Sequence, residues 1–150
     1  MQTFSIAIHS ILRYAILIAL FIAVYRYFSF WRSGKAFEKS DSKLSLILMI
    51  IADLTAVFGL LNYFVYSSLT RTAFNDFGAA MKDSSLRFWA VEHIFGMVIA
   101  IVLIHLAKNQ AKKSISDEKK HKRSFVYLLI ALAIMLISIP WGAARWDFVW

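Results

Sequence analysis

Four long apolar runs constrain the fold of this chain more than any other feature of its sequence. They cover residues 4–31, 44–66, 86–107 and 125–141. A helix needs about 20 apolar residues to cross the hydrocarbon core of a bilayer. Lipid offers no hydrogen-bond partners, so each run must satisfy its own backbone as a helix. The sequence therefore predicts an all-α membrane protein, a four-transmembrane-helix bundle that forms a single domain over residues 1–150.

The composition agrees with this class and excludes several others. Hydrophobic residues make up 60% of the chain and charged residues 17%, whereas soluble domains carry about 25% charged residues. The absence of cysteine excludes disulfides, iron–sulfur clusters and thioether-linked haem. The sequence contains no phosphate-binding loop, nucleophile elbow or zinc-binding helix motif. It therefore favours a carrier or an accessory subunit over an enzyme.

The net charge of +8 is distributed unevenly among the connections. The connections at residues 32–43 and 108–124 hold most of the basic side chains, and the connection at residues 69–85 holds few. Basic connections stay on the cytoplasmic side of a membrane. We therefore expect both termini and residues 69–85 on the extracytoplasmic side, and no nucleic acid as a partner. Within residues 119–123, His121 is expected to belong to a solvated basic loop.

Two further features concern the ends of the predicted spans. The first run has no basic leading segment and no obvious cleavage site, so we expect a retained helix instead of a signal peptide. Pro140 is expected to end or kink the fourth helix, because proline lacks a backbone donor and clashes with the preceding turn.

Ionisable side chains inside the spans are the positions most informative about function. Each is costly in lipid unless it faces the bundle interior, a partner or water. Arg26 and Arg87 can reach the nearer membrane interface. The remaining side chains of this kind are His9, Arg13, Asp53, Glu92, His93 and His105.

Two of these histidines are expected at similar depths. With a helical rise of 1.5 Å per residue, His9 lies about 9 Å and His93 about 12 Å below the extracytoplasmic surface. His105 falls at the cytoplasmic boundary, and Asp53 near the midplane. Two imidazoles that face each other at one level suit the axial positions of a b-type haem. We therefore expect His9 and His93 as haem-iron ligands, with no catalytic residue.

Neighbouring residues could complete or replace this site. Gly96 and Ala100 share a helical face with His93 and would leave room for a ring, although small-xxx-small patterns more simply indicate helix packing. Arg13 could pair with a haem propionate. It could instead form a structural polar network with Asp53 and Glu92.

Several strings resemble a family of small bacterial four-helix integral membrane proteins that is labelled cytochrome-b-like. They are HSILRY at residues 9–14, GLLNYF at 59–64, MKDSSLRFWAVEH at 81–93 and SIPW at 138–141. The likeness covers most of the chain. It implies a haem protein of the bacterial inner (cytoplasmic) membrane, in which His9 and His93 match the family's histidines of helices one and three. The family pattern has a histidine in helix two where this chain has Asp53, and a carboxylate is a poor haem ligand.

Three functions remain as hypotheses. The first is a single-haem b-type cytochrome-like protein that relays electrons within a membrane redox assembly. The alternative is a non-catalytic accessory or assembly subunit of a larger membrane complex, with no haem. The third is a proton or small-ion path through Arg13, Asp53 and Glu92. All three place the protein in the lipid bilayer, and the first two among other membrane subunits.

Overall fold

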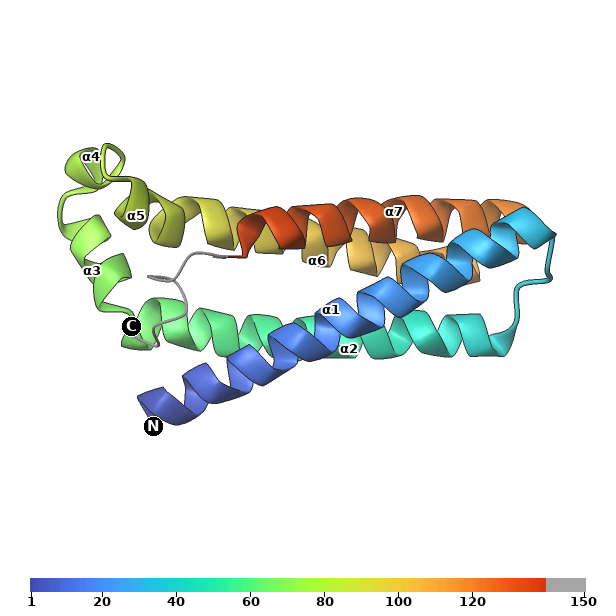
Figure 1. The fold of residues 1–150 in the computed structure, drawn as a ribbon, viewed down its shortest axis with the longest axis horizontal. Helices are drawn as coiled ribbons and strands as arrows, with labels where there is room; N and C mark the ends of the chain where they lie inside the picture. The colour runs from blue at the N-terminus through green and yellow to red at the C-terminus, as the bar shows by residue number, and fades with distance from the viewer. Residues whose placement is uncertain (140–150) are drawn as a thin grey trace.

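The computed structural model describes residues 1–139, and the regular elements in that range are all helices (Figure 1). Four continuous helical segments are long and apolar enough to cross a membrane. The expected all-helical fold with four membrane-spanning helices is therefore confirmed, and the chain is a multi-pass membrane protein. The expected kink at Pro140 and the last residues of the fourth run, 140–141, lie outside the described residues.

The four segments are longer than the apolar runs that predicted them. The first is α1 (Gln2–Ser33), and the second is α2 (Lys39–Leu61) continued by the π-helical η1 (Asn62–Tyr66). The third runs through α5 (Ser84–Arg87), the π-helical η2 (Phe88–Glu92), α6 (His93–Asn109) and the 3-10 helix η3 (Gln110–Lys112). The fourth is α7 (Asp117–Ser138). Polar residues can prolong a helix beyond its apolar part, so hydropathy alone understates its length.

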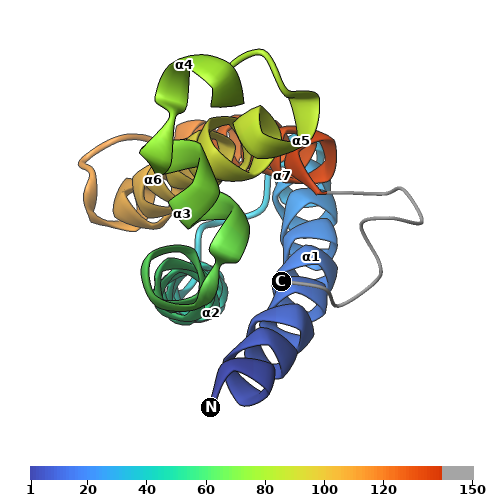
Figure 2. The same cartoon turned by 90° about the vertical axis from the view of Figure 1, so that its left-hand side faces the viewer.

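The connection at residues 69–85, expected as a loop, instead contains short helices. They are α3 (Ser68–Asn75) and α4 (Phe77–Ala80), followed by α5. Each begins at a side-chain cap, because Ser67, Asp76 and Asp83 each accept a hydrogen bond from a backbone N–H three residues later. Such caps satisfy donors that a helix start leaves unpaired. Figures 1 and 2 show these helices at one end of the bundle, the end that also carries the N-terminus.

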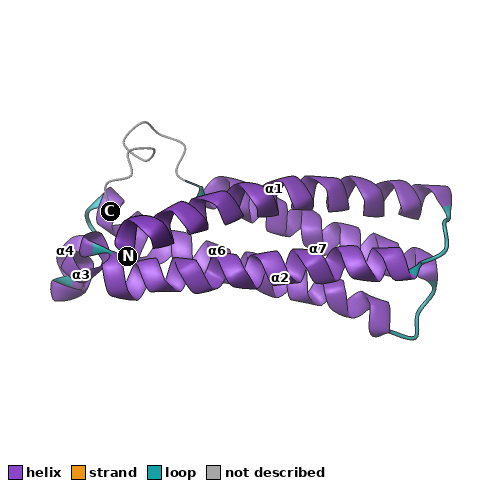
Figure 3. Ribbon diagram, turned by 90° about the horizontal axis from the view of Figure 1, so that it is seen from below, coloured by secondary structure: helices purple, strands orange, loops and turns teal. Residues whose placement is uncertain are grey.

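The long helices pack around a shared apolar core. α7 contacts α1 and α6, and α2 contacts the same two helices from the other side (Figure 3). Each long helix contributes a fully buried branched side chain to one cluster: Leu20, Leu48, Ile104 and Leu128. This layer lies toward the end of the bundle opposite α3 and α4.

Gly96 allows α6 to approach α7 closely. A Cβ atom built on Gly96 would collide with the Oγ atom of Ser138 and lie 3.2 Å from its Cβ atom. Ala100, one turn further on, is fully buried in the core. The small-xxx-small pattern at these two positions therefore serves helix packing.

We expect Gly96→Leu to lower the free energy of unfolding by about 1–3 kcal/mol, because an added side chain must push α7 away from α6. Thermal or SDS-induced unfolding in detergent would measure the change. Gly78→Leu is the matched control, since a Cβ there meets only Asp76, at 3.6 Å. Equal stability of the two variants would contradict the close packing at Gly96.

At the end of the bundle opposite α3 and α4, a buried carboxylate ties α1 to α2. Asp41 is fully buried, and its Oδ1 atom lies 2.8 Å from Nε of Arg26. Its Oδ2 atom accepts the backbone N–H of Glu38 at 2.9 Å, as part of the capping box of α2. Arg26 therefore forms an ion pair with Asp41. From the sequence, its side chain was expected only to reach the nearer membrane interface.

The expectation that His121 lies in a solvated loop is wrong. His121 belongs to the first turns of α7 and is fully buried. Its ring lies among three aromatic rings, with centroid distances of 5.8 Å to Tyr27, 5.7 Å to Phe30 and 5.1 Å to Phe37. Because α7 starts before the apolar run, His121 lies on a face of the basic segment that packs against α1.

Candidate functional site

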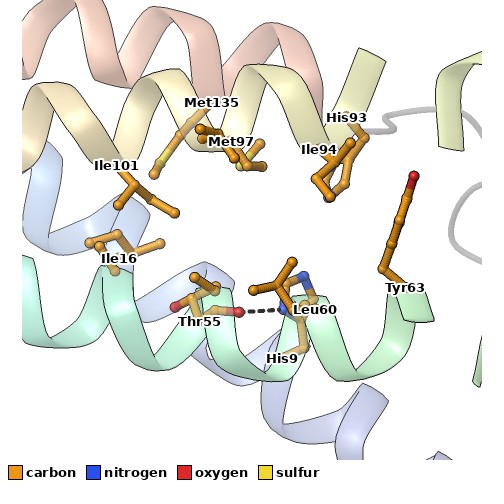
Figure 4. Close-up of a pocket in the computed structure, with 14 residues that line it drawn as sticks. His9, Ile16, Thr55, Leu60, Tyr63, His93, Ile94, Met97, Ile101 and Met135 are labelled. Atoms are coloured by element: carbon orange, nitrogen blue, oxygen red, sulfur yellow. Dashed lines mark hydrogen bonds between the residues drawn. The ribbon is translucent and has the colours of Figure 1, made fainter. Parts of the chain in front are cut away.

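A cavity of about 110 Å³ lies inside the bundle, and both candidate ligand histidines line it. His9 reaches it from α1 and His93 from the start of α6, and Figure 4 shows them on opposite sides of the space. Most of the remaining wall is apolar and comes from α2 and α6, with Ile16 of α1 and Met135 of α7. The structure thus brings together two imidazoles that stand 84 positions apart, at 9 and 93, in the sequence.

Both imidazoles are held in the same way. Nδ1 of His9 lies 3.1 Å from the carbonyl oxygen of Thr55 on α2, and Nδ1 of His93 lies 2.9 Å from that of Ser138 on α7. A carbonyl oxygen can only accept, so Nδ1 must carry the hydrogen in each ring. Each neutral ring then keeps its lone pair on Nε2. That is the form in which histidine binds a metal, with the other nitrogen oriented by a backbone carbonyl.

A glycine makes room for the first of these rings. A Cβ atom on Gly59 of α2 would lie 3.1 Å from Cε1 of His9, tighter than ordinary van der Waals contact. The close approach also places His9 within hydrogen-bonding distance of Thr55 one turn earlier on α2. The glycine thus lets α1 and α2 meet beside the cavity.

Two π-helical segments border the site, η1 at the end of α2 and η2 directly before His93. They contact each other, since the hydroxyl of Tyr63 in η1 donates to the carbonyl oxygen of Ala90 in η2 at 2.6 Å. Short π-helical turns often occur at functional sites. The sequence does not indicate these segments, because over five residues the apolar periodicity of a π-helical turn cannot be distinguished from that of an α-helical turn.

A second, smaller cavity of about 40 Å³ adjoins the first and shares four lining residues with it: His9, Gly59, Tyr63 and His93. Its other lining residues include Asn62 of η1, Ser67 and Thr70 at the start of α3, and Trp89 of η2. The pair of cavities therefore has an apolar part between α2 and α6 and a more polar part toward α3.

Asp53 and Glu92, expected to form a polar network with Arg13, each lie close to another ionisable side chain. Glu92 Oε1 lies 2.7 Å from Nε of Arg87, and Asp53 Oδ1 lies 3.5 Å from Nε2 of His105. The guanidinium of Arg13 lies over the ring of Tyr14, with Cζ 4.9 Å from the centroid.

The Asp53–His105 pair joins α2 to α6 at the outer surface of the bundle. Its side chains are 46% and 40% exposed. Sequence reasoning treated His105 as an interfacial residue and missed this contact, because only helix packing decides which residues of two helices meet.

We expect a double-mutant cycle of Asp53→Leu and His105→Leu to give a small coupling energy, about 0.6 kcal/mol, as for other polar pairs between membrane helices. The free energy of unfolding in detergent would be measured for both single variants and the double variant. Strictly additive effects would show that the two side chains do not stabilise each other.

The donor set limits which metal centre the site could hold. Within residues 1–139, no group of three or more His, Cys, Asp or Glu side chains could bind a metal ion. A zinc site needs at least three protein ligands, whereas a haem iron needs two axial ligands at most. The two histidines therefore fit haem better than a bare metal ion.

The fold and the site define a multi-pass, four-helix membrane protein in which a pair of half-buried histidines lines an apolar cavity. Comparisons with protein-family models, curated proteins and solved structures found no match to the chain. The resemblance to the cytochrome-b-like family therefore stays a prediction based on the strings quoted above.

Proposed function

We propose that this protein is a small b-type cytochrome that holds one haem between α1 and α6 and relays electrons within a membrane redox assembly. The observation that carries the proposal is the pair His9 and His93. Both line one cavity, and both donate Nδ1–H to a carbonyl of a neighbouring helix.

The lining of the cavity is apolar, as a porphyrin site requires. The walls between the two histidines are formed by apolar side chains, among them Leu60, Ile94 and Met97. A macrocycle has two apolar faces, which such walls would bury. Gly96, by contrast, packs against Ser138 and is not part of the lining.

The departure from the family pattern falls outside this cavity. Asp53 is not among the lining residues and pairs with His105 instead. A ligand from helix two is therefore not required for a single haem held by helices one and three.

Bound haem would supply a one-electron Fe(III)/Fe(II) couple. Two imidazole ligands would leave no open position on the iron for oxygen or substrate. The chain's part is to hold the ligands in a water-poor site. We therefore propose electron transfer without bond-making chemistry, and assign no catalytic residue.

The distribution of charge supports an orientation in the membrane. The basic connections lie at the end of the bundle opposite α3 and α4, which share their end with the N-terminus. By the positive-inside rule, that basic end faces the cytoplasm of a bacterial inner membrane. The N-terminus, the end of α7 and the histidine site then belong to the extracytoplasmic half.

The visible absorption spectrum of the detergent-solubilised protein tests the proposal. We expect a reduced-minus-oxidised spectrum of a b-type haem with two histidine ligands, at about one haem per chain. A preparation that is colourless, and stays colourless after hemin is added, would overturn it.

One observation favours the second candidate, an accessory subunit of a larger complex without haem. The Asp53–His105 pair is partly exposed on the outer surface, where lipid cannot solvate it. A partner helix could cover it. In that case the Asp53→Leu/His105→Leu double variant should lose a co-purifying subunit without any change in haem content. An unchanged subunit composition would count against it.

A further inference from the structure

The smaller cavity beside the two histidines has a surplus of hydrogen-bond donors. We call it the polar chamber, and its lining residues are His9, Gly59, Asn62, Tyr63, Ser67, Thr70, Trp89 and His93. Its volume of about 40 Å³ exceeds what one water molecule needs, about 10–15 Å³. The chamber contains no carboxylate side chain.

The first surplus donor is the amide of Asn62. This side chain is 6% exposed, and its Oδ1 atom accepts a hydrogen bond of 2.7 Å from Oγ of Ser5. Its Nδ2 atom is buried and has no hydrogen-bond partner. A buried donor without a partner destabilises the folded protein, so a group that accepts a hydrogen bond from Nδ2 would remove that cost.

The second surplus donor comes from a pair of hydroxyls. Ser67 and Thr70 are 5% and 3% exposed, and their hydroxyl oxygens lie 2.9 Å apart. One hydroxyl hydrogen is used in that bond, whichever residue donates, and the other is left over. The structure gives the leftover hydrogen no acceptor among residues 1–139.

These donors lie next to an apolar cavity with which they share His9 and His93. A matching ligand has an apolar part that enters the larger cavity and an oxygen acceptor, best an anionic one, that reaches the chamber. Hydrogen bonds to a charged acceptor are the strong ones. Haem has this shape, with an apolar macrocycle and carboxylates on one edge.

We propose that the polar chamber receives a haem propionate, and that Asn62 Nδ2 and the Ser67–Thr70 hydroxyl pair donate to its carboxylate. This assignment rests on the proposed haem site. It also sets the direction of the haem, with the propionate edge toward α3 and the opposite edge toward the middle of the bundle.

Arg13, considered from the sequence as a partner of a propionate, does not line the chamber, and neither do the basic residues Lys82 and Arg87. Arg87 donates to Glu92 at 2.7 Å and to the carbonyl of Met81 at 3.1 Å. Neither Arg13 nor Lys82 is among the residues of either cavity. The proposed partners of the propionate are therefore neutral hydrogen-bond donors and not arginine side chains.

Titration with hemin and with hemin dimethyl ester tests the proposal. The ester keeps the iron and the macrocycle but masks the carboxylates. We expect the wild-type protein to bind hemin at least about tenfold more tightly than the ester, the size of one hydrogen bond to a charged group. This comparison needs no variant.

Variants of Asn62 sharpen the test. Asn62→Asp has nearly the same shape and keeps an acceptor for Ser5, but it replaces the donor with an acceptor. It should lose the preference for hemin over the ester while the bis-histidine spectrum of the ester complex stays unchanged. Asn75→Asp, an exposed position at the end of α3, is the matched control and should keep the preference.

The outcomes separate the two proposals. Equal affinity for hemin and the ester, with a bis-histidine spectrum for both, would overturn the propionate assignment and leave the cytochrome proposal standing. No such spectrum with either compound would overturn both. Binding of palmitate that Asn62→Asp abolishes, in a protein that takes up no hemin, would assign the chamber to a fatty-acid carboxylate and overturn the haem assignment.

Discussion

His93→Ala is expected to abolish the b-type spectrum of the purified protein. The imidazole of His93 lines the cavity and is held against the carbonyl of Ser138 at 2.9 Å. Loss of one axial ligand removes a metal bond and leaves the iron with one imidazole. We expect haem content below about one tenth of the wild-type value, because altering a metal site's ligands or their supports costs 10–100-fold in affinity.

His9→Ala should have the same effect, since the two rings hold equivalent positions in the cavity. His105→Ala is the matched control, because His105 faces Asp53 outside the cavity and its loss should leave the spectrum unchanged. Added imidazole should restore a low-spin spectrum in the His93→Ala variant. If His105→Ala, and not His93→Ala, removes the haem, then the proposed ligand pair is wrong.

Arg26→Met is expected to lower the free energy of unfolding by about 3 kcal/mol. The change removes the cation that lies 2.8 Å from the fully buried Asp41 and leaves the carboxylate uncompensated. Asp41 cannot turn to solvent, because its other oxygen caps α2 through Glu38 and its carbonyl accepts the hydroxyl of Tyr27 at 2.7 Å. SDS-induced unfolding in detergent micelles would measure the loss.

Arg32→Met is the matched control for this prediction, since it removes the same charge from the last turn of the same helix at an exposed position. We expect it to change stability by less than about 0.5 kcal/mol. The double variant Arg26→Met/Asp41→Ser should recover part of the loss, because no unpaired carboxylate remains. Equal effects of Arg26→Met and Arg32→Met would show that the buried ion pair contributes nothing specific.

The helices could be predicted because the constraint on them is local. A run of apolar residues in lipid must close its own backbone hydrogen bonds, so each run predicts a helix whatever its neighbours are. The ends were less predictable. Residues 69–85 form short helices that depend on side-chain caps, and α7 begins at Asp117 because Ser116 accepts the N–H of Lys119.

The site was predictable in part. The constant rise of a helix relates sequence position to depth, and His9 and His93 do line one cavity. Depth does not determine the direction in which a side chain points. Asp53 was expected near Arg13 by height, yet its partner is His105.

The amino-acid sequence by itself determined that this is an all-helical, multi-pass membrane protein and which ionisable residues stand inside its spans. Both follow from hydropathy and helical rise, which are properties of single segments. Only the tertiary structure decided the rest, namely the shared cavity of the two histidines, the burial of His121 and the unpaired amide of Asn62. These depend on how the helices are rotated about their axes and on two π-helical turns. The rotation of the helices and the π-helical turns are both determined by packing between segments that are distant in the sequence.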